Sequence, residues 1–188
     1  MPRPRSDEKR SAILEAATRV IVTQGLGAPT AGIAKEAGVA NGSLFTYFET
    51  KKDLFNALYL ELKGEMASAA MRGLPGDADI RKQFFHVWKN WTNWALAYPE
   101  KRRALAQLGV SEEITPETRV AAHKVMTGVA ELLERGRANG PMSKAPRAFV
   151  ATLMNSVAEA TMDFMNQDSA RAAKHCKEGF DAMWRMIA

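Results

Sequence analysis

The stretch TAGIAKEAGVANGSLFTYF, residues 30–48, decides the fold that this sequence predicts. The Thr30 hydroxyl can cap a short helix, whose apolar residues recur at helical spacing, namely Ile33, Ala34 and Ala37. Gly38 stands where the chain must leave this helix in a left-handed conformation, which glycine adopts without a steric penalty. A second short helix follows, and three of its residues are predicted to face inward: Leu44, Phe45 and Phe48. This order of two short helices around a glycine turn predicts a helix-turn-helix, whose second helix lies in the DNA major groove.

A longer helix is predicted on each side of this stretch. The upstream helix can be capped by Ser6 and ends at Gly25. The downstream helix runs from Lys51 to Arg72, and Thr50 and Asp53 form a T-x-x-D capping box at its start. We therefore expect a helix-turn-helix domain over residues 1–52, with helix 51–72 as a connector to the remainder of the chain.

The same residues resemble the N-terminal domain of TetR-family transcriptional regulators. The elements AA, G…T, IA…AGV, G-S-L-F-x-Y-F and K-K-D-L match in order and spacing. Across the remainder, the sequence is most similar to RamR-type multidrug-sensing repressors, through the stretches VSEEITPET, EATMDF, DSARA and GF-DAMWR. The resemblance implies a homodimeric repressor that binds a palindromic double-stranded DNA operator and is released by a small hydrophobic or aromatic effector.

The second short helix carries outward side chains that suit DNA. Asn and Thr can bond to base edges, whereas Ser and Tyr hydroxyls suit phosphate oxygens, and Gly42 lets the backbone approach closely. Ala40 stands at the cap position where the family commonly has Ser, so Asn41 must substitute or this helix is looser before DNA binds.

Basic residues flank this helix. Lys51 and Lys52 stand at a helix start, where phosphate binding is favoured. Arg3 and Arg5 belong either to an arm that reaches phosphates or a minor groove, or to a frayed basic terminus. The predicted DNA-binding residues are Arg3, Arg5, Thr30, Asn41, Gly42, Ser43, Thr46, Tyr47, Lys51 and Lys52.

The remainder of the chain, residues 53–188, is predicted to be a helical ligand-binding and dimerisation domain. After a break at residues 73–77, helices are expected at about 79–98, 100–108, 115–137, 146–166 and 169–187. No stretch alternates convincingly as a strand. The fold class is therefore all-α, with about nine helices.

Aromatic and sulfur-containing residues in this part indicate either an adaptable ligand cavity or a plain helical core. Three tryptophans lie within seven residues, and the chain has ten methionines. The resemblance favours the cavity, because Tyr59 and Trp88 fall where RamR-like relatives have aromatic ligand contacts. The predicted ligand-binding residues are Tyr59, Met66, Phe84, Trp88, Trp91 and Met154.

The last two helices are apolar over much of their girth and need a partner. By resemblance, they form a four-helix dimer interface with their mates; the alternative is that they close a bundle within the chain. The predicted interface residues are Phe149, Leu153, Val157, Thr161, Phe180, Met183 and Trp184.

Composition and missing motifs narrow the function classes. The net charge of +5 is compatible with a polyanionic partner. Cys176 is the only cysteine, which excludes an internal disulfide and points to a cytoplasmic protein, and no apolar run is long enough to span a bilayer. The histidines lack metal-ligand spacing, and no nucleophile elbow, phosphate loop or metalloprotease motif is found. We expect no catalysis, no metal and no cofactor.

Two alternatives outside this class stay open. One is a small-molecule carrier whose DNA-binding end is vestigial, and the other is a helical enzyme that uses the cavity. Within the regulator class, activation remains as open as repression, since the sign depends on where the operator lies.

Overall fold

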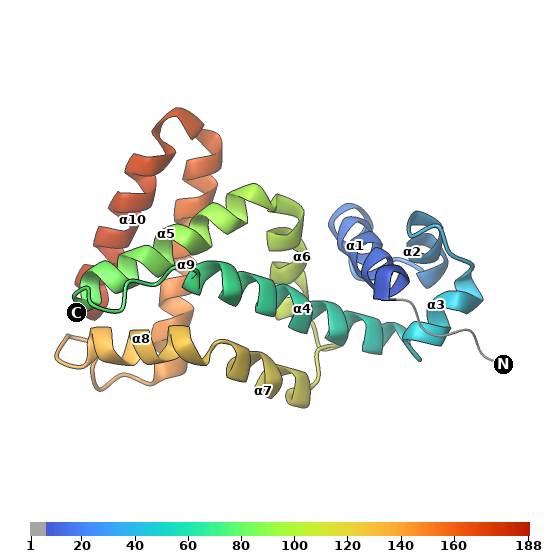
Figure 1. The fold of residues 1–188 in the computed structure, drawn as a ribbon, viewed down its shortest axis with the longest axis horizontal. Coiled ribbons are helices and arrows are strands. Elements are labelled where there is room, and N and C mark those ends of the chain that lie inside the picture. The colour runs from blue at the N-terminus through green and yellow to red at the C-terminus, as the bar shows by residue number, and fades with distance from the viewer. Residues whose placement is uncertain (1–6) are drawn as a thin grey trace. The chain divides into compact units, whose positions relative to one another are not determined.

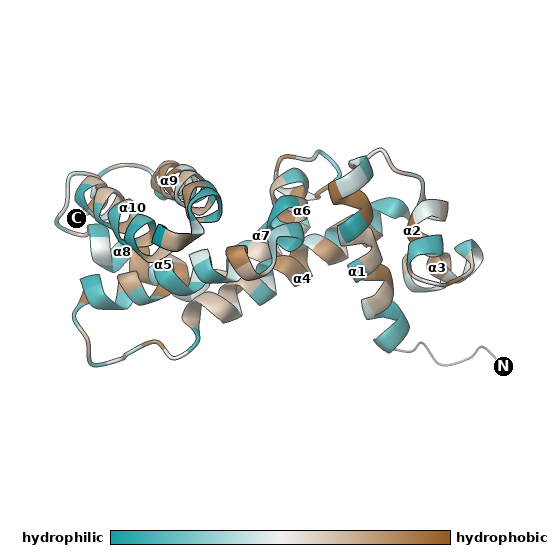
Figure 2. Cartoon of the chain, turned by 90° about the horizontal axis from the view of Figure 1, so that it is seen from above, coloured by the Kyte–Doolittle hydropathy of each residue, from teal (hydrophilic) through white to brown (hydrophobic). Residues whose placement is uncertain are grey.

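The computed structural model describes residues 7–188 (Figure 1). These residues form ten α-helices and one short 3₁₀ helix, with no β-strand, which confirms the all-α fold class. In chain order the helices are α1 (Asp7–Gln24), α2 (Thr30–Glu36), α3 (Asn41–Tyr47), α4 (Lys51–Met71), α5 (Ile80–Ala97), α6 (Pro99–Gly109), α7 (Pro116–Val125), α8 (Thr127–Arg137), α9 (Arg147–Gln167), η1 (Ser169–Arg171) and α10 (Ala172–Ile187). Hydrophilic and hydrophobic residues occur on the same helices, teal beside brown in Figure 2, as expected of amphipathic helices.

The chain divides into two compact units. The first takes in residues 1–64 with 99–124, and the second takes in residues 65–98 with 125–188. This division differs from the boundary after residue 52 that the sequence predicts, because α6 packs against α1 in the first unit. The helix α4 is continuous, and its residues from Glu65 onward are grouped with the second unit.

Glycines set the turns of the first unit. Gly25 has a φ of +77° directly after α1, and Gly38 has a φ of +66° between α2 and α3. Both are left-handed conformations that a Cβ atom disfavours, so the sequence predicts these two turns correctly. The helices that they connect bury Ile13, Ile33 and Leu44 completely. The helix-turn-helix is thus held by an apolar core to which α1, α2 and α3 each contribute.

Side-chain caps in the first unit agree with the sequence at one helix and differ at another. At α4, the Thr50 backbone N–H and hydroxyl donate to Asp53 Oδ2 over 3.0 and 2.8 Å, and the Asp53 N–H donates to Thr50 Oγ1 over 3.1 Å. This confirms the predicted capping box. At α2, the prediction that Thr30 is the cap is wrong. Pro29 occupies that position in an extended conformation, its side chain has no acceptor, and Thr30 is the first residue of the helix.

The second unit is built on α5, α8, α9 and α10, which pack against one another. Trp88 on α5, Met162 on α9 and Met183 on α10 are all 1% exposed or less. Between α9 and α10 the helices approach so closely that a Cβ at Gly179 would clash with the Thr161 side chain. Gly179 therefore sets the contact of these two helices.

The single helix predicted over residues 115–137 is two helices. The break falls at Met126, which has φ −87° and ψ 7° and precedes α8. Gly128 follows, and a Cβ there would lie 3.0 Å from the Met71 Cε atom at the end of α4. Glycine is a poor helix former, and this close contact with α4 is a tertiary feature that local periodicity does not reveal.

Candidate nucleic-acid interface and aromatic cluster

The α3 helix presents most of its predicted DNA-binding residues to solvent. Asn41, Gly42, Ser43 and Thr46 are exposed, and Tyr47 is half-buried. Leu44 is fully buried and anchors the helix from below. The structure therefore brings these five residues together on one short helix.

The start of α3 lacks a side-chain cap. Ala40 occupies the N-cap position in an extended conformation, and no side chain bonds to the free N–H groups there. This confirms that the cap is lost and shows that Asn41 does not substitute for it. The free N–H groups at this end remain available to an anion.

Phe45 points outward, contrary to the sequence prediction. Its side chain is 41% exposed, whereas Leu44 and Phe48 are buried. Leu44 and Phe48 are four residues apart and share one helix face, and Phe45 lies about 100° further round the helix. The spacing of Leu44 and Phe48 therefore predicts the buried face correctly, and Phe45, which directly follows Leu44, lies outside that face.

Basic side chains border α3 at the start of α4. Lys52 is exposed, and Lys51 is half-buried with its Nζ atom 5.3 Å from the centre of the Phe55 ring. On α1, Arg10 lies over the Phe48 ring and donates to Glu61 over 3.1 Å. The other two basic residues that were predicted to bind DNA, Arg3 and Arg5, lie outside the described residues.

The predicted ligand-binding residues of the second unit are mostly buried in its aromatic core. Phe84 and Trp88 are 2% and 1% exposed, Met66 and Met154 are buried, and Trp91 is half-buried. The Trp88 indole N–H donates to the Cys176 carbonyl over 3.0 Å. This arrangement supports the plain-core alternative for Phe84 and Trp88.

Rings fill the space around Trp88. Its ring centre lies 6.0 Å from that of Trp91 and 6.3 Å from that of Phe180. Trp184 stacks on Phe180 and meets Phe84 edge-on. We define these five rings together with Phe85, which lies 4.9 Å from Phe180, as the aromatic cluster.

The remaining predicted ligand residue, Tyr59, belongs to the first unit and is 7% exposed. Burial raises the pKa of its phenol, and the charge of Arg119 opposes that effect. Lys63 lies one turn further along α4 with its Nζ atom 5.7 Å from the Tyr59 ring centre. Burial also lowers the pKa of Lys63.

Two hollows open on the surface of the second unit. The first, of about 270 Å³, lies between α5 and α10, with Phe85 and Phe180 in its lining. Its rim is charged, since Asp181 accepts from Arg81 over 2.7 Å and from Lys177 over 2.6 Å. The second hollow, of about 440 Å³, lies between α9 and α10, beside Phe164 and Gly179.

The predicted dimer-interface residues fall into two groups. Phe149 is exposed, and Leu153 and Val157 are half-buried along α9. Phe180 and Met183 are 2% and 0% exposed within the chain itself, Thr161 is buried, and Trp184 is half-buried in the aromatic cluster. Within the single chain, Phe180 and Met183 are therefore core residues of the unit, because the buried face of α10 packs on α5 and α9.

The exposed apolar stripe on α9 extends beyond the predicted set. Phe164 is 59% exposed and lines the hollow beside Gly179, together with Ala160. Its spacing from Val157 of seven residues places both on one helix face, so the sequence pattern could have identified it. At the C-terminal end of α9, the Asp168 carboxylate lies 2.9 Å from His175 Nε2. That hydrogen bond is the main reason why the pKa of Asp168 is lowered.

Two kinds of feature are absent from the described part of the chain. Among residues 7–188, no group of three or more His, Cys, Asp and Glu side chains could hold a metal ion. Over the same residues, no helix combines the length and apolarity needed to cross a membrane.

Comparisons with known proteins give this geometry its context. The family described as "Bacterial regulatory proteins, tetR family" matches residues 13–58. A crystal structure of a TetR-family transcription regulator from Shewanella sp. PV-4 is 30% identical, with a TM-score of 0.86, over 98% of this chain and 99% of that chain. The chain belongs to the TetR family of transcriptional regulators.

Further relatives agree with this family. The HTH-type transcriptional regulator AcrR of Shigella flexneri is 32% identical over 110 residues, which is 55% of this chain and 48% of that protein. The chain spans about half the length of the curated relatives that it matches. The TetR-like regulator LfrR of Mycobacterium smegmatis, crystallised in complex with proflavine, shares the fold with a TM-score of 0.70 at 17% identity, over 97% of this chain and 98% of that one.

As a TetR-family regulator, the protein is a DNA-binding transcriptional regulator with its helix-turn-helix in α2 and α3. The family match covers most of α1, all of α2 and α3, and the first turns of α4. The exposed residues Asn41, Ser43 and Thr46 lie on the second helix of this helix-turn-helix.

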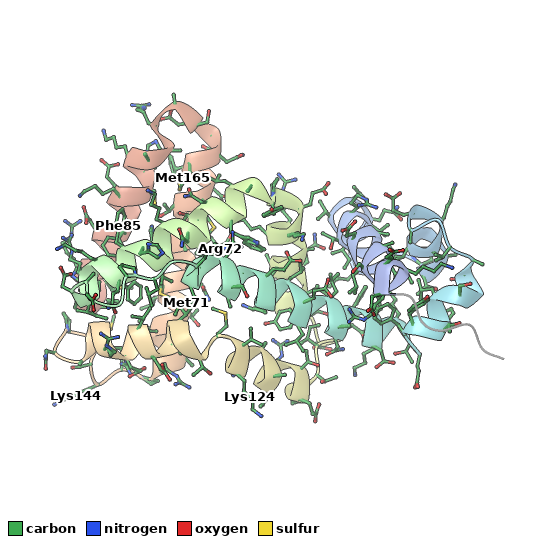
Figure 3. All side chains as sticks on the ribbon, in the orientation of Figure 1. Met71, Arg72, Phe85, Lys124, Lys144 and Met165 are labelled. Carbon is green, nitrogen blue, oxygen red and sulfur yellow. The ribbon has the colours of Figure 1, made fainter. Side chains whose placement is uncertain are left out.

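One asparagine in each unit attaches α4 to other parts of that unit, and the sequence does not predict either of them. In the first unit, Asn56 donates to the Glu113 carbonyl over 2.8 Å and accepts from the Thr115 N–H over 2.9 Å. In the second unit, Asn90 donates to the carbonyl oxygen of Arg72 over 3.0 Å. Arg72 follows Met71 at the C-terminal end of α4 (Figure 3). The partner atoms in these three hydrogen bonds belong to the backbone of residues that are distant in the sequence. No pattern of side chains therefore identifies Asn56 and Asn90.

Proposed function

We propose that this TetR-family regulator is a homodimeric, ligand-responsive repressor of the RamR type that binds a palindromic operator. A small hydrophobic or aromatic effector releases it from DNA. The outward face of α3 carries the proposal, because it offers Asn41, Ser43 and Thr46 to solvent on a helix anchored by Leu44. Lys52 and the free N–H groups at the start of α3 suit the flanking phosphates.

The homodimer is proposed to form through α9 and α10. Phe149 and Phe164 expose 52% and 59% of their surface, with half-buried Leu153 and Val157 between them. Such a continuous apolar stripe favours contact with a second copy over exposure to water. A twofold axis through this face would present two α3 helices to the two halves of a palindrome.

The effector is proposed to bind at the aromatic cluster in the second unit. Trp91 is half-buried there, and methionines such as Met154 can rearrange around a guest. The packed state of Phe84 and Trp88 means that a guest must open the cluster, as cryptic sites require. The proflavine complex of LfrR, a protein of the same fold, supports an effector of this kind.

The signal is proposed to travel along α4. This helix is held by Asn56 in the first unit and by Asn90 at its last carbonyls in the second. An effector that shifts α4 would change the spacing of the two α3 helices in the dimer. A coupling of about 1–3 kcal/mol would change operator affinity roughly 5- to 150-fold.

The experiment combines operator selection with effector titration. Fragments of genomic DNA that the protein retains would supply the duplex, and compounds that quench its tryptophan fluorescence would supply the effector. We expect affinity for the selected duplex to fall when the compound is added. Equal affinity with and without the compound would refute the switch but leave DNA binding intact. Equal binding of selected and random duplexes would instead favour a small-molecule carrier.

A further inference from the structure

The chemistry of α3 limits which base pairs it can recognise. Its sequence is NGSLFTY, which contains neither arginine nor lysine. Arginine or lysine bonding to the O6 and N7 atoms of guanine is the commonest specific contact in the major groove. The helix therefore lacks the side chains that usually select G·C pairs.

Asn41 stands at the position where a recognition helix meets base edges first. It is the first residue of α3 and is exposed. The N-terminal residues of recognition helices contact bases, and an asparagine amide pairs bidentately with the N6 and N7 atoms of adenine. Asn41 thus favours an A·T pair.

Phe45 provides the second part of the pattern. Its ring is 41% exposed, although Leu44 beside it and Phe48 one turn later are buried. The phenyl ring cannot donate or accept a conventional hydrogen bond, so it suits neither a phosphate nor a polar base edge. The apolar group that a base pair presents in the major groove is the C5-methyl group of thymine.

Thr46 adds a second apolar group next to Phe45. Its hydroxyl donates to the Gly42 carbonyl within the helix, over 3.5 Å. While that bond is kept, the outward features of Thr46 are its methyl group and oxygen lone pairs. Single exposed apolar residues are common on protein surfaces, so Phe45 alone would prove little. The informative feature is that Phe45 is exposed beside Thr46 and one turn after Asn41, both polar and exposed, on a helix without arginine or lysine.

We propose that α3 reads A·T base pairs, with Asn41 bonding to adenine and the Phe45 ring packing against a thymine methyl group. This inference rests on the proposed function, because it requires α3 to enter the major groove. It assigns to Phe45 a role in specificity and to the operator half-sites a core of A·T pairs.

The test begins with selection from a pool of duplexes that carry a fully randomised central segment. We expect the retained duplexes to carry A·T pairs at adjacent positions in each half-site. Each thymine of the selected duplex is then replaced in turn by deoxyuridine, which lacks only the methyl group. One replacement per half-site should weaken binding about fourfold, the equivalent of one buried methyl group.

Variants connect this effect to the residue. Phe45→Ala should bind the thymine and deoxyuridine duplexes equally, whereas Phe45→Leu should keep part of the preference. The matched control is Val120→Ala on α7, an exposed apolar residue that should leave the preference unchanged. A circular-dichroism melt of Phe45→Ala checks that the exposed substitution leaves the fold intact.

The outcomes separate this inference from the function on which it rests. Selected half-sites rich in G·C pairs, or deoxyuridine duplexes that bind as well as thymine duplexes at every position, would overturn A·T reading while DNA binding stands. Equal loss of preference in Val120→Ala would overturn the role of Phe45. A pool that shows no enrichment at all would overturn the proposed function itself.

Discussion

The Asn56 Oδ1 atom accepts a hydrogen bond from the Thr115 backbone N–H over 2.9 Å. The same side chain donates from Nδ2 to the Glu113 carbonyl over 2.8 Å and to the Lys52 carbonyl over 2.7 Å. One amide thus fastens α4 to the segment that precedes α7. All three contacts lie within the first unit, whose α3 helix carries the DNA-binding side chains.

Replacing Asn56 should loosen this attachment. In Asn56→Ala, the Thr115 N–H and Glu113 carbonyl lose their partner, and we expect the free energy of unfolding to fall by about 1–3 kcal/mol. Urea denaturation followed by circular dichroism measures this. Asn93→Ala, at an exposed position on α5, is the matched control and should change little. An equal loss of unfolding free energy in both variants would mean that the hydrogen bonds of Asn56 do not stabilise the first unit.

Trp88 should contribute through its indole N–H as well as through its volume. Trp88→Phe keeps a ring but removes the donor to the Cys176 carbonyl, and we expect a loss of roughly 1 kcal/mol in addition to repacking. Trp88→Ala should cost about 3–5 kcal/mol because it leaves a cavity. Denaturant unfolding of both variants separates the contribution of the hydrogen bond from the contribution of the side-chain volume. Trp91→Phe, at a half-buried site, is the comparison and should cost less than Trp88→Phe.

Asp181 should make stability depend on pH in the acid range. Hydrogen bonding from Lys177, together with the charges of Lys177 and Arg81, lowers the pKa of Asp181 from its ordinary value of 3.8. Because the folded pKa is lower, the stabilisation is present above pH 3.8 and is lost as the pH falls through the folded value.

The check is the unfolding midpoint of the wild type and of Asp181→Asn between about pH 2 and pH 6. The two curves should converge toward the acid end and separate above it, with the wild type more stable. Asp77→Asn, exposed in the segment between α4 and α5, is the control. A constant difference between wild type and Asp181→Asn at every pH would contradict this linkage.

The exposed stripe on α9 should hold the dimer. Phe164→Glu places a charge where an apolar ring would meet its partner, and we expect the dimer dissociation constant to rise at least about tenfold. Analytical ultracentrifugation at several concentrations gives this constant. Val120→Glu on α7 should have no such effect. Unchanged self-association in Phe164→Glu would place the interface elsewhere.

The sequence predicts local features of this fold well. Gly25 and Gly38 end their helices, and the Thr50–Asp53 box begins α4, because each signal acts within one turn of chain. The cap at Thr30 fails because Pro29 already provides the N-cap backbone conformation. The prediction of one continuous helix over residues 115–137 is wrong for a different reason. The chain breaks at Met126, next to Gly128, which approaches Met71 on another helix. Local patterns cannot show such a contact.

In the candidate sites too, the sequence predicts features set by local spacing but not those set by tertiary packing. Asn41, Ser43 and Thr46 are exposed as predicted, because the spacing of α3 fixes their face once Leu44 is buried. The sequence predicts Phe180 and Met183 at a dimer interface, and it does not show that both are buried within the chain, because tertiary packing decides which face of α10 meets α5. The attachments made by Asn56 and Asn90 are not predicted for the same reason, since the backbone atoms of Glu113, Thr115 and Arg72 that they bind are distant in the sequence.

The most direct test of the central proposal is equilibrium binding of the purified protein to duplexes retained from genomic DNA, against random duplexes of equal length, over a range of salt concentrations. We expect tighter binding to the retained duplexes, a decrease with rising salt, and at least two protomers per duplex. Tyr47→Ala and Lys52→Ala should weaken binding to all sequences while the dimer persists, and Thr46→Ala should relax preference at a single base step. Equal binding of retained and random duplexes by a monomeric protein would contradict the proposal that a pair of α3 helices reads an operator.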